Sequence, residues 1–272
     1  MCGIVGAISE RKISRILLEG LKRLEYRGYD SAGIALLSER SDKLQQLRSV
    51  GKVRKLSDTI TKRKLQGTIG IAHTRWATHG KPSVKNAHPH TSQNEIAIVH
   101  NGIIENHELL RDQLTERGYE FRTETDSEVI AHLIHQEKKN GKVSFLNSVI
   151  RALGKLKGAY GICAIDNSNR DQIIVARSGS PIVIGIGIGE NFIASDPLAL
   201  GHVTDRFIYL EEGDIAQVTR ESVEIWNNAE QVSRPITTID SKIKDVQKGE
   251  YKHFMLKAVS YTHLTLPTKR IV

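Results

Sequence analysis

The spacing of short apolar runs in the second half of the chain constrains its fold more than any other feature of the sequence. Runs rich in Ile, Val and Phe cover residues 160–165, 172–176, 182–188, 192–194, 207–210 and 223–226. A parallel pair of strands needs a crossover of about a dozen residues or more, and most of these gaps are shorter. The spacing therefore predicts antiparallel strands.

Helical periodicity is confined to the part of the chain before this region. Apolar residues recur at helical spacing over about 13–28, 106–118, 126–134 and 145–156, and strands are expected at 33–37, 68–73 and 95–100. Helices in the middle of the chain with strands on either side predict α+β layering rather than a doubly wound sheet. The 272 residues, 39% of them hydrophobic, suffice for one core or at most two.

Cysteine content and charge narrow the class of protein. Only Cys2 and Cys163 occur, without a Cys-x-x-Cys pair, which favours a reducing, cytoplasmic setting and argues against a thiolate zinc site. No apolar run approaches the roughly 20 residues of a membrane span, and the N-terminus lacks the apolar stretch of a signal peptide. We therefore expect no contact with membrane.

The net charge of +8 arises in residues 1–68, which hold 15 Lys and Arg against 7 Asp and Glu. Much of it lies between residues 40 and 64, where no aromatic side chain interleaves with the charges. A nucleic-acid site that stacks bases needs such aromatic residues. We therefore expect a solvated face or loop and no nucleic-acid partner, with a basic binding module as the alternative.

Cys2 is the strongest candidate for a catalytic residue. It follows Met1, and aminopeptidases remove Met before a residue as small as Cys, so one residue then carries both a thiol and a free α-amine. Their reference pKa values of about 8.5 and about 7.7–8.0 suit the amine to take the thiol proton near neutral pH. This is the logic of an N-terminal nucleophile. The alternative is a small apolar core residue.

Two later segments carry groups that bind oxygen. Arg75 lies where a predicted strand becomes a loop, and its guanidinium can fork onto a carboxylate or form a surface salt bridge, with Trp76 as a lid beside it. Asn101 and Gly102 end another predicted strand. Their side-chain amide and backbone N–H are the parts of an oxyanion hole, although Asn-Gly also makes simple turns.

Asp126 precedes a predicted helix, where it serves either as an N-cap or as a ligand for an ammonium group. A nucleophile, an oxyanion hole, a carboxylate clamp and an ammonium clamp together fit a free α-amino acid with a side-chain amide. Glutamine is such a substrate. This interpretation requires the segments to converge in space.

Residues 2–6, 73–80 and 100–106 together resemble the class II glutamine amidotransferases. Within that class, residues 26–33 and 73–80 are similar to the members that convert fructose 6-phosphate to glucosamine 6-phosphate. The resemblance covers about residues 2–257. It implies a four-layer αββα sandwich of two antiparallel sheets, of the N-terminal nucleophile hydrolase type, with no cofactor and no metal.

The resemblance also implies a role for each candidate residue. In catalysis, Cys2 forms a γ-glutamyl thioester with its α-amine as base, and Asn101 and Gly102 form the oxyanion hole. The implied substrate-binding residues are Arg75 for the α-carboxylate, Asp126 for the α-ammonium, Thr78 and His79 in the loop that closes over glutamine, and Trp76, which gates the ammonia path.

The implied partners are L-glutamine and a sugar-isomerase half that receives the ammonia. We expect residues 2–220 to form the amidotransferase domain and 221–257 to end it and begin a linker to that half. Residues 258–272 do not match the family and are interpreted as a non-native tail. A monomer is expected for this chain and a homodimer for the longer protein.

Two further alternatives remain at this point. The first is the glutaminase domain of another class II amidotransferase, such as amidophosphoribosyltransferase or asparagine synthetase. The second is a metal protein, because His73, His79, His88 and His90 form a cluster in the sequence. That cluster has no Glu spaced as in His-Glu-x-x-His and no Cys ligands.

Overall fold

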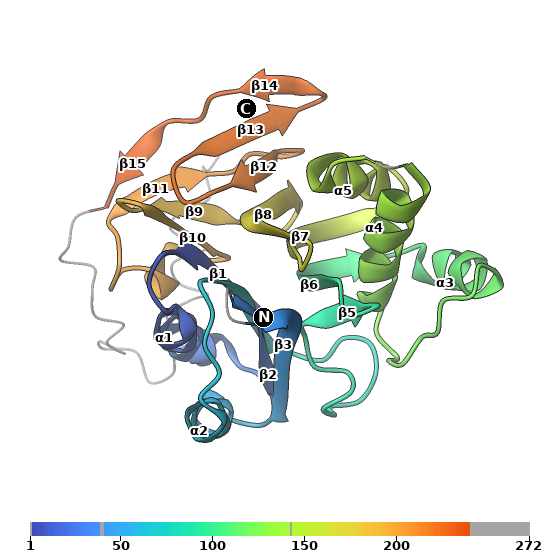
Figure 1. Cartoon of the computed structure of the whole chain (residues 1–272), viewed down its shortest axis with the longest axis horizontal. Helices are drawn as coiled ribbons and strands as arrows, with labels where there is room; N and C mark the ends of the chain where they lie inside the picture. Colours follow the sequence, from blue (N-terminus) through green and yellow to red (C-terminus); the bar gives the residue numbers. More distant parts are fainter. Residues whose placement is uncertain (1, 39–40, 142, 240–272) are drawn as a thin grey trace, which may run out of the picture.

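The computed structural model describes residues 2–38, 41–141 and 143–239. In this part of the chain two sheets face each other, and helices cover the outer face of each sheet (Figure 1). Every pairing of strands in it is antiparallel, which confirms the interpretation of the short apolar runs. The α+β sandwich of two antiparallel sheets is likewise confirmed.

The first sheet has eight strands in the described ranges, in the order β15-β11-β9-β10-β1-β4-β2-β3. They are β1 (Gly3–Ser9), β2 (Ser31–Ser38), β3 (Ser41–Val50), β4 (Ile69–Arg75), β9 (Val183–Ile186), β10 (Glu190–Ala194), β11 (Arg206–Tyr209) and β15 (Ile236–Thr238). The N-terminal strand β1 is central, because β4 pairs with it on one side and β10 on the other.

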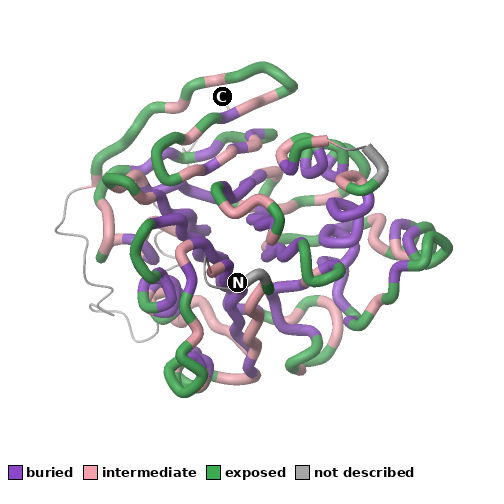
Figure 2. The backbone as a smooth tube through the Cα atoms, in the orientation of Figure 1, coloured by how far each residue is buried: buried purple, intermediate pink, exposed green. Residues whose placement is uncertain are grey.

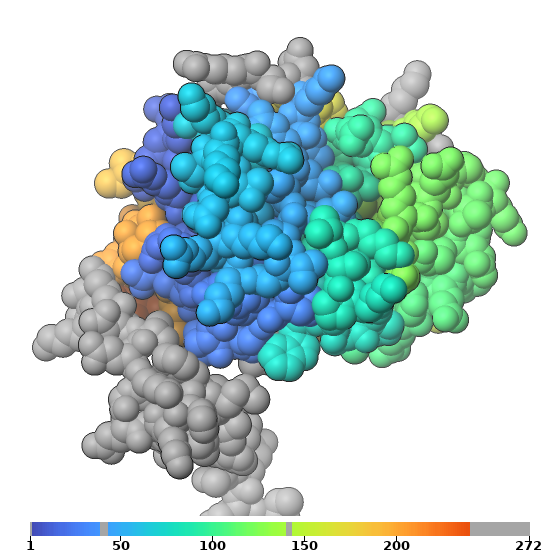
Figure 3. All heavy atoms as spheres, turned by 90° about the horizontal axis from the view of Figure 1, so that it is seen from below, coloured from blue at the N-terminus to red at the C-terminus, as the bar shows by residue number. Residues whose placement is uncertain are grey.

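The second sheet has seven strands in the same ranges, in the order β14-β13-β12-β8-β7-β6-β5. They are β5 (His90–Ser92), β6 (Ile96–Ile104), β7 (Gly158–Asp166), β8 (Asn169–Ser178), β12 (Ile215–Val218), β13 (Val223–Asn227) and β14 (Glu230–Val232). Figure 3 shows one face of the molecule, where the blue and cyan atoms of the first part of the chain meet the green atoms of its middle part.

The described helices divide between the two outer faces. They are α1 (Ser14–Leu24), α2 (Val53–Arg63), α3 (His107–Glu116), α4 (Glu128–Gly141) and α5 (Phe145–Leu153), with short 3-10 turns η1 (Glu25–Arg27) and η2 (Pro197–Ala199). Helices α1 and α2 pack on the first sheet, and α3, α4 and α5 on the second. None of them is long and apolar enough to cross a membrane.

Three apolar cores separate these four layers. Strand β1 shows why its sequence is a continuous apolar run: Ile4 and Ile8 point into the core between the sheets, whereas Val5 and Ala7 point into the core under α1. Strands buried on both faces read as unbroken apolar runs, and only the loops and outermost surfaces are exposed (Figure 2).

Two regions can be compared with the expectations. The described part of the basic segment 40–64 forms edge strand β3 and helix α2, and its charged residues Lys52, Arg54 and Lys62 are exposed, as expected for a solvated face. Beyond residue 220, β13 and β14 extend the second sheet and β15 extends the first, so residues 221–239 are built into the sandwich. The expected linker end and the tail at 258–272 lie outside the described residues.

Candidate functional site

The candidate nucleophile lies where β1 begins and β4 ends. The pairing of Gly3 with Thr74 brings Cys2 beside the last residue of β4 and the loop that follows. The Cys2 Sγ atom accepts a hydrogen bond from the Trp76 N–H at 3.2 Å. Burial raises the pKa of the Cys2 thiol, although the bond from Trp76 and the charge of Arg75 act to lower it. The thiol is therefore protonated near neutral pH.

Asn101, one of the two candidate oxyanion donors, lies next to Cys2 on the facing sheet. Asn101 Nδ2 donates to the Cys2 carbonyl oxygen at 3.3 Å. Strand β6 continues through Asn101 and Gly102 to Ile104, so the alternative of a simple Asn-Gly turn is wrong. Gly102 has φ +129°, and a Cβ atom there would lie 2.0 Å from the Ala159 carbonyl oxygen, so the position requires glycine.

The loop after β4 closes around Arg75. Its Nη2 atom donates to the carbonyl oxygens of His79 and Gly80, the latter at 3.0 Å. The side chain is buried, with 3% of the residue exposed, and Nη1 makes no hydrogen bond within the described residues. The nearest carboxylate to Nη1 is that of Asp30, with an Oδ1 distance of 3.9 Å. Arg75 therefore holds the loop and keeps one donor group unused.

Asp30 is a functional candidate that the sequence analysis missed. Its Oδ2 accepts from the Ala77 N–H at 2.5 Å, and its own N–H donates to the Arg75 carbonyl oxygen at 2.7 Å. Asp30 therefore anchors the chain at Arg75 and at Ala77, on either side of Trp76. The sequence signal that could have identified Asp30 is its position in segment 26–33, which already carried the family resemblance.

The remaining loop residues are more open. Trp76 is 52% exposed and packs against Gly28, where φ is +82° and a Cβ atom would lie 2.0 Å from the indole. Thr78 is exposed and has no hydrogen bond in the described part of the chain. The His79 ring meets the His107 ring edge to face, with 5.3 Å between centroids.

Asp126 lies at the same end of β6 as the oxyanion donors. Its Oδ2 accepts from the Ile104 N–H at 2.9 Å, and its Oδ1 accepts from the Ser127 hydroxyl at 3.2 Å. Helix α4 begins two residues later, at Glu128, so these bonds tie the carboxylate to β6 rather than cap the helix. With 4% of the residue exposed, Asp126 is a buried carboxylate beside the candidate site.

Three of the four histidines of the metal alternative have their rings in contact. The His88 ring lies 4.2 Å from that of His73 and 4.3 Å from that of His90, between centroids, while His79 faces a different ring. Within residues 2–38, 41–141 and 143–239, no group of three or more His, Cys, Asp or Glu side chains is arranged to hold a metal ion. The geometry does not support the metal alternative.

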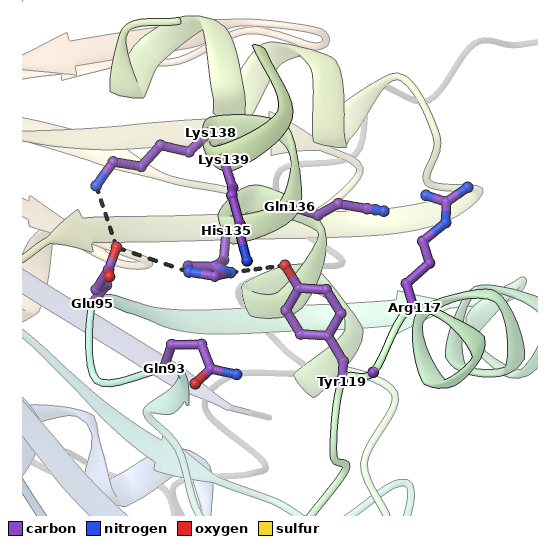
Figure 4. A pocket seen from close by; sticks show the side chains of 9 residues that line it. Gln93, Glu95, Arg117, Tyr119, His135, Gln136, Lys138 and Lys139 are labelled. Carbon is purple, nitrogen blue, oxygen red and sulfur yellow. Dashed lines mark hydrogen bonds and ion pairs between the residues drawn. The ribbon is translucent and has the colours of Figure 1, made fainter. Parts of the chain in front are cut away.

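A hollow lies at the opposite end of β6, away from Cys2. It encloses about 960 Å³ and is lined by Gln93, Glu95, Arg117, Gly118, Tyr119, His135, Gln136, Lys138 and Lys139. Figure 4 shows Glu95 facing Lys138 and His135, with His135 bonded to the Tyr119 hydroxyl. No group there matches the candidate nucleophile or oxyanion donors, so volume alone does not locate the chemistry.

Comparison with known proteins agrees with this geometry. The family model of the glutamine amidotransferase domain matches residues 73–200. The chain is 53% identical over 259 residues to the glutamine–fructose-6-phosphate aminotransferase (isomerizing) of Acinetobacter baylyi, and 55% identical over 260 residues to that of Idiomarina loihiensis. Each match covers 95% of this chain, which spans 42% of the length of either relative.

Solved structures give the same fold. The glutamine phosphoribosylpyrophosphate amidotransferase of B. subtilis superposes with a TM-score of 0.71 at 28% identity, over 83% of this chain and 49% of that one. A glutamine aminotransferase class-II domain protein of Silicibacter pomeroyi, 16% identical with a TM-score of 0.58, shares the fold over 84% of this chain and all of its own. Residues 73–200 therefore match the glutamine amidotransferase domain family, and the chain shares the sandwich fold of the N-terminal nucleophile hydrolases.

Proposed function

We propose that this chain hydrolyses L-glutamine to glutamate and ammonia through a thioester on Cys2, once Met1 has been removed. The observation that carries the proposal is the meeting of Cys2 with Asn101, whose Nδ2 lies 3.3 Å from the Cys2 carbonyl oxygen. A nucleophile and an amide donor at one point are what attack on a carbonyl group requires.

The chemistry runs in two steps. The α-amine of Cys2 takes the thiol proton, and Sγ attacks the side-chain carbonyl carbon of glutamine. The Asn101 amide and the Gly102 N–H stabilise the negative oxygen. The C–N bond breaks, the proton passes from the α-amine to the leaving nitrogen, and ammonia departs. Water, which gives a proton to the α-amine, then attacks the thioester carbonyl carbon. The C–S bond breaks, Cys2 Sγ takes the proton back, and glutamate leaves.

Because the Cys2 thiol is partly buried, its reaction needs a base close by. Because the pKa of the Cys2 thiol is raised, little thiolate forms at neutral pH without a proton acceptor close by. The freed α-amine is part of the same residue and needs no further positioning.

In this proposal the protein binds both charged groups on the α-carbon of the substrate. Arg75 binds the α-carboxylate and Asp126 the α-ammonium, with Thr78 and His79 in the covering loop. Arg75 is 3% exposed because that loop encloses it, so glutamine reaches the guanidinium only when residues 76–80 move outward. The unused Nη1 donor of Arg75 is then available for the carboxylate.

The longer protein implied by the relatives extends the proposal. There, ammonia would pass Trp76 into a sugar-isomerase half and convert fructose 6-phosphate to glucosamine 6-phosphate. We propose a monomer for the present chain and a homodimer for the longer protein, both in the cytoplasm, where the free thiols of Cys2 and Cys163 stay reduced. Residues 2–220 and the strands up to residue 239 would form the glutaminase unit.

The test is intact mass before and after incubation with 6-diazo-5-oxo-L-norleucine, a glutamine analogue that alkylates such nucleophiles. The expected result is loss of Met1 and one adduct on Cys2 that excess glutamine prevents. Cys163→Ala should label like the unmodified protein because Cys163 is buried between the sheets, whereas Cys2→Ala should not label. A processed protein that takes no label, or labelling that glutamine does not prevent, would overturn the proposal.

A further inference from the structure

We infer that His73 is a positioning residue for the reaction: its Nε2–H holds the Asn101 amide in the orientation that turns the amide N–H groups toward the reacting carbonyl. The inference rests on the proposed glutaminase function and adds a residue to it. His73 contacts neither the Cys2 thiol nor the loop over the substrate in any hydrogen bond of the described chain.

The partners of His73 assign its tautomer. Nε2 lies 3.1 Å from the His100 carbonyl oxygen and 3.0 Å from Asn101 Oδ1. A carbonyl oxygen only accepts hydrogen bonds, so Nε2 must carry the proton. The same proton then requires the oxygen of the Asn101 amide, and not its nitrogen, to face the imidazole.

This bond fixes the other side of the amide. With Oδ1 held by His73, Nδ2 points the opposite way, and it donates to the Cys2 carbonyl oxygen at 3.3 Å. The oxygen and nitrogen of an Asn amide have nearly the same shape, so packing alone does not choose between the two orientations. A flipped amide would set its N–H against the His73 N–H and present an acceptor to the developing oxyanion.

His73 stays neutral, and so keeps this role, near neutral pH. Its ring is fully buried, and burial lowers its pKa to about 3, although the bond to Asn101 acts in the opposite direction. The other ring nitrogen, Nδ1, has no partner within the described residues. The single proton of the neutral ring therefore resides on Nε2, where its two acceptors are.

The surrounding structure leaves the imidazole little freedom. His73 belongs to β4 and is paired with Ile4 of β1 on one side and Gly33 of β2 on the other. The His88 ring stacks against it at 4.2 Å between centroids. A donor held this rigidly meets the precision that preorganised oxyanion stabilisation demands.

The experiment is a double-mutant cycle on glutamine hydrolysis with His73→Leu, Asn101→Ala and the two together. We expect His73→Leu to lower kcat by about 10- to 100-fold, part of the 10²–10³ that loss of an oxyanion donor costs, with KM for glutamine changed less than about threefold. In the Asn101→Ala background the same substitution should change kcat by less than about twofold, because its target is gone.

Two further variants separate positioning from packing. His73→Gln places its amide nitrogen the same number of bonds from Cα as Nε2, so it should recover most of kcat, whereas the shorter His73→Asn should not. His132→Leu is the matched control, since His132 is an equally buried imidazole bonded to Ser92 on the far side of the second sheet. It should lose stability yet keep kcat within about twofold.

The outcomes distinguish this inference from the proposed function. If the unmodified, processed protein releases no glutamate, the proposed function itself fails. If it is active and Asn101→Ala is impaired, but His73→Leu is fully active or its effect multiplies that of Asn101→Ala, then the positioning role is wrong.

Discussion

The two ends of strand β6 differ in how far the polar side chains around them are buried. At the end near Ile104, the polar side chains are buried. His73, His100 and Asp126 are each at most 4% exposed, and each forms a hydrogen bond through its side chain. At the start of the strand, the Glu95 side chain is 48% exposed beside the open hollow of Figure 4. The enclosed end near Ile104 has the more tightly held polar groups.

The comparison teaches that a site for covalent chemistry is recognised by how tightly its polar groups are held. Water screens charges at the open end, so rearranging them costs little. At the enclosed end His73, His100 and Asp126 each have a set hydrogen-bond partner, and a change in one group leaves another unsatisfied. Changes at the enclosed end should therefore have large effects and changes at the open end small ones.

Gly102→Ala should have the largest effect. The new methyl group would lie 2.0 Å from the Ala159 carbonyl oxygen at a φ of +129°, so the strand must shift and carry its N–H away from the oxyanion. We expect kcat for glutamine hydrolysis to fall by more than about 10³-fold, or about 4 kcal/mol. Gly118→Ala, where nothing lies within 4 Å, is the control for adding a methyl group at a positive φ.

Acid should weaken the buried histidine cluster around His73 next. Burial lowers the pKa of His73 and of His90 to about 3, whereas an unfolded histidine titrates near 6.5. Below pH 6.5 the unfolded chain binds protons that the folded chain excludes until about pH 3, so stability falls as pH falls. At pH 5 each histidine should cost about 2 kcal/mol, together about 4 kcal/mol.

Urea unfolding at pH 7.5 and pH 5.0 measures this loss. His90→Gln should recover about 2 kcal/mol of the difference, because one titrating group is removed. Equal stability of the unmodified protein at the two pH values would show that these histidines are not excluded from protonation, and the contrast between the two ends would lose its electrostatic basis.

Asp30→Asn should have an intermediate effect. The amide supplies one acceptor in place of two, and its NH2 group disrupts either the Ala77 N–H bond or the Ser31 bond. The loop that carries Arg75 then loses its anchor, and we expect kcat/KM for glutamine to fall by about 10- to 100-fold, or about 1.4–2.7 kcal/mol. Activity within twofold of the unmodified protein would mean that Arg75 alone holds the loop.

Glu95→Gln, the same chemical change at the open end, should have the smallest effect. Its contacts with His135 and Lys138 are 3.8 and 3.7 Å long and partly exposed. We expect less than about 0.5 kcal/mol in the free energy of unfolding and kcat/KM within about twofold. A loss of glutaminase activity comparable with that of Asp30→Asn would break the comparison and assign the hollow a part in the reaction.

Much of this molecule could be predicted from sequence because its strands are buried on both faces. Apolar patterns located β4, β6 and β7. Residue type and order marked Cys2, Arg75 and Asn101 as candidates. Strand β3 and helix α2 were missed because their segment is rich in charge. Its few apolar residues, such as Leu47 and Leu56, suffice at the edge of a sheet.

The connections between segments could not be predicted. Asp30 becomes an anchor only because β2 and β4 pair with Ser31 opposite Arg75, and no local pattern encodes that register. The same holds for His73, whose role depends on which atom of a residue on the other sheet lies 3.0 Å away. The periodicity of a segment predicts which face a side chain lies on, but not which residue it contacts.

The central place of β1 has a consequence for the order of events during synthesis. Val5 of β1 pairs with Ala194 of β10, which is translated last among the neighbours of β1. At about 5–20 residues per second, about 10–40 s separate the synthesis of Val5 from that of Ala194. Over that interval β10 has not yet closed beside β1, so the strand next to Cys2 lacks one of its two neighbours until late in synthesis.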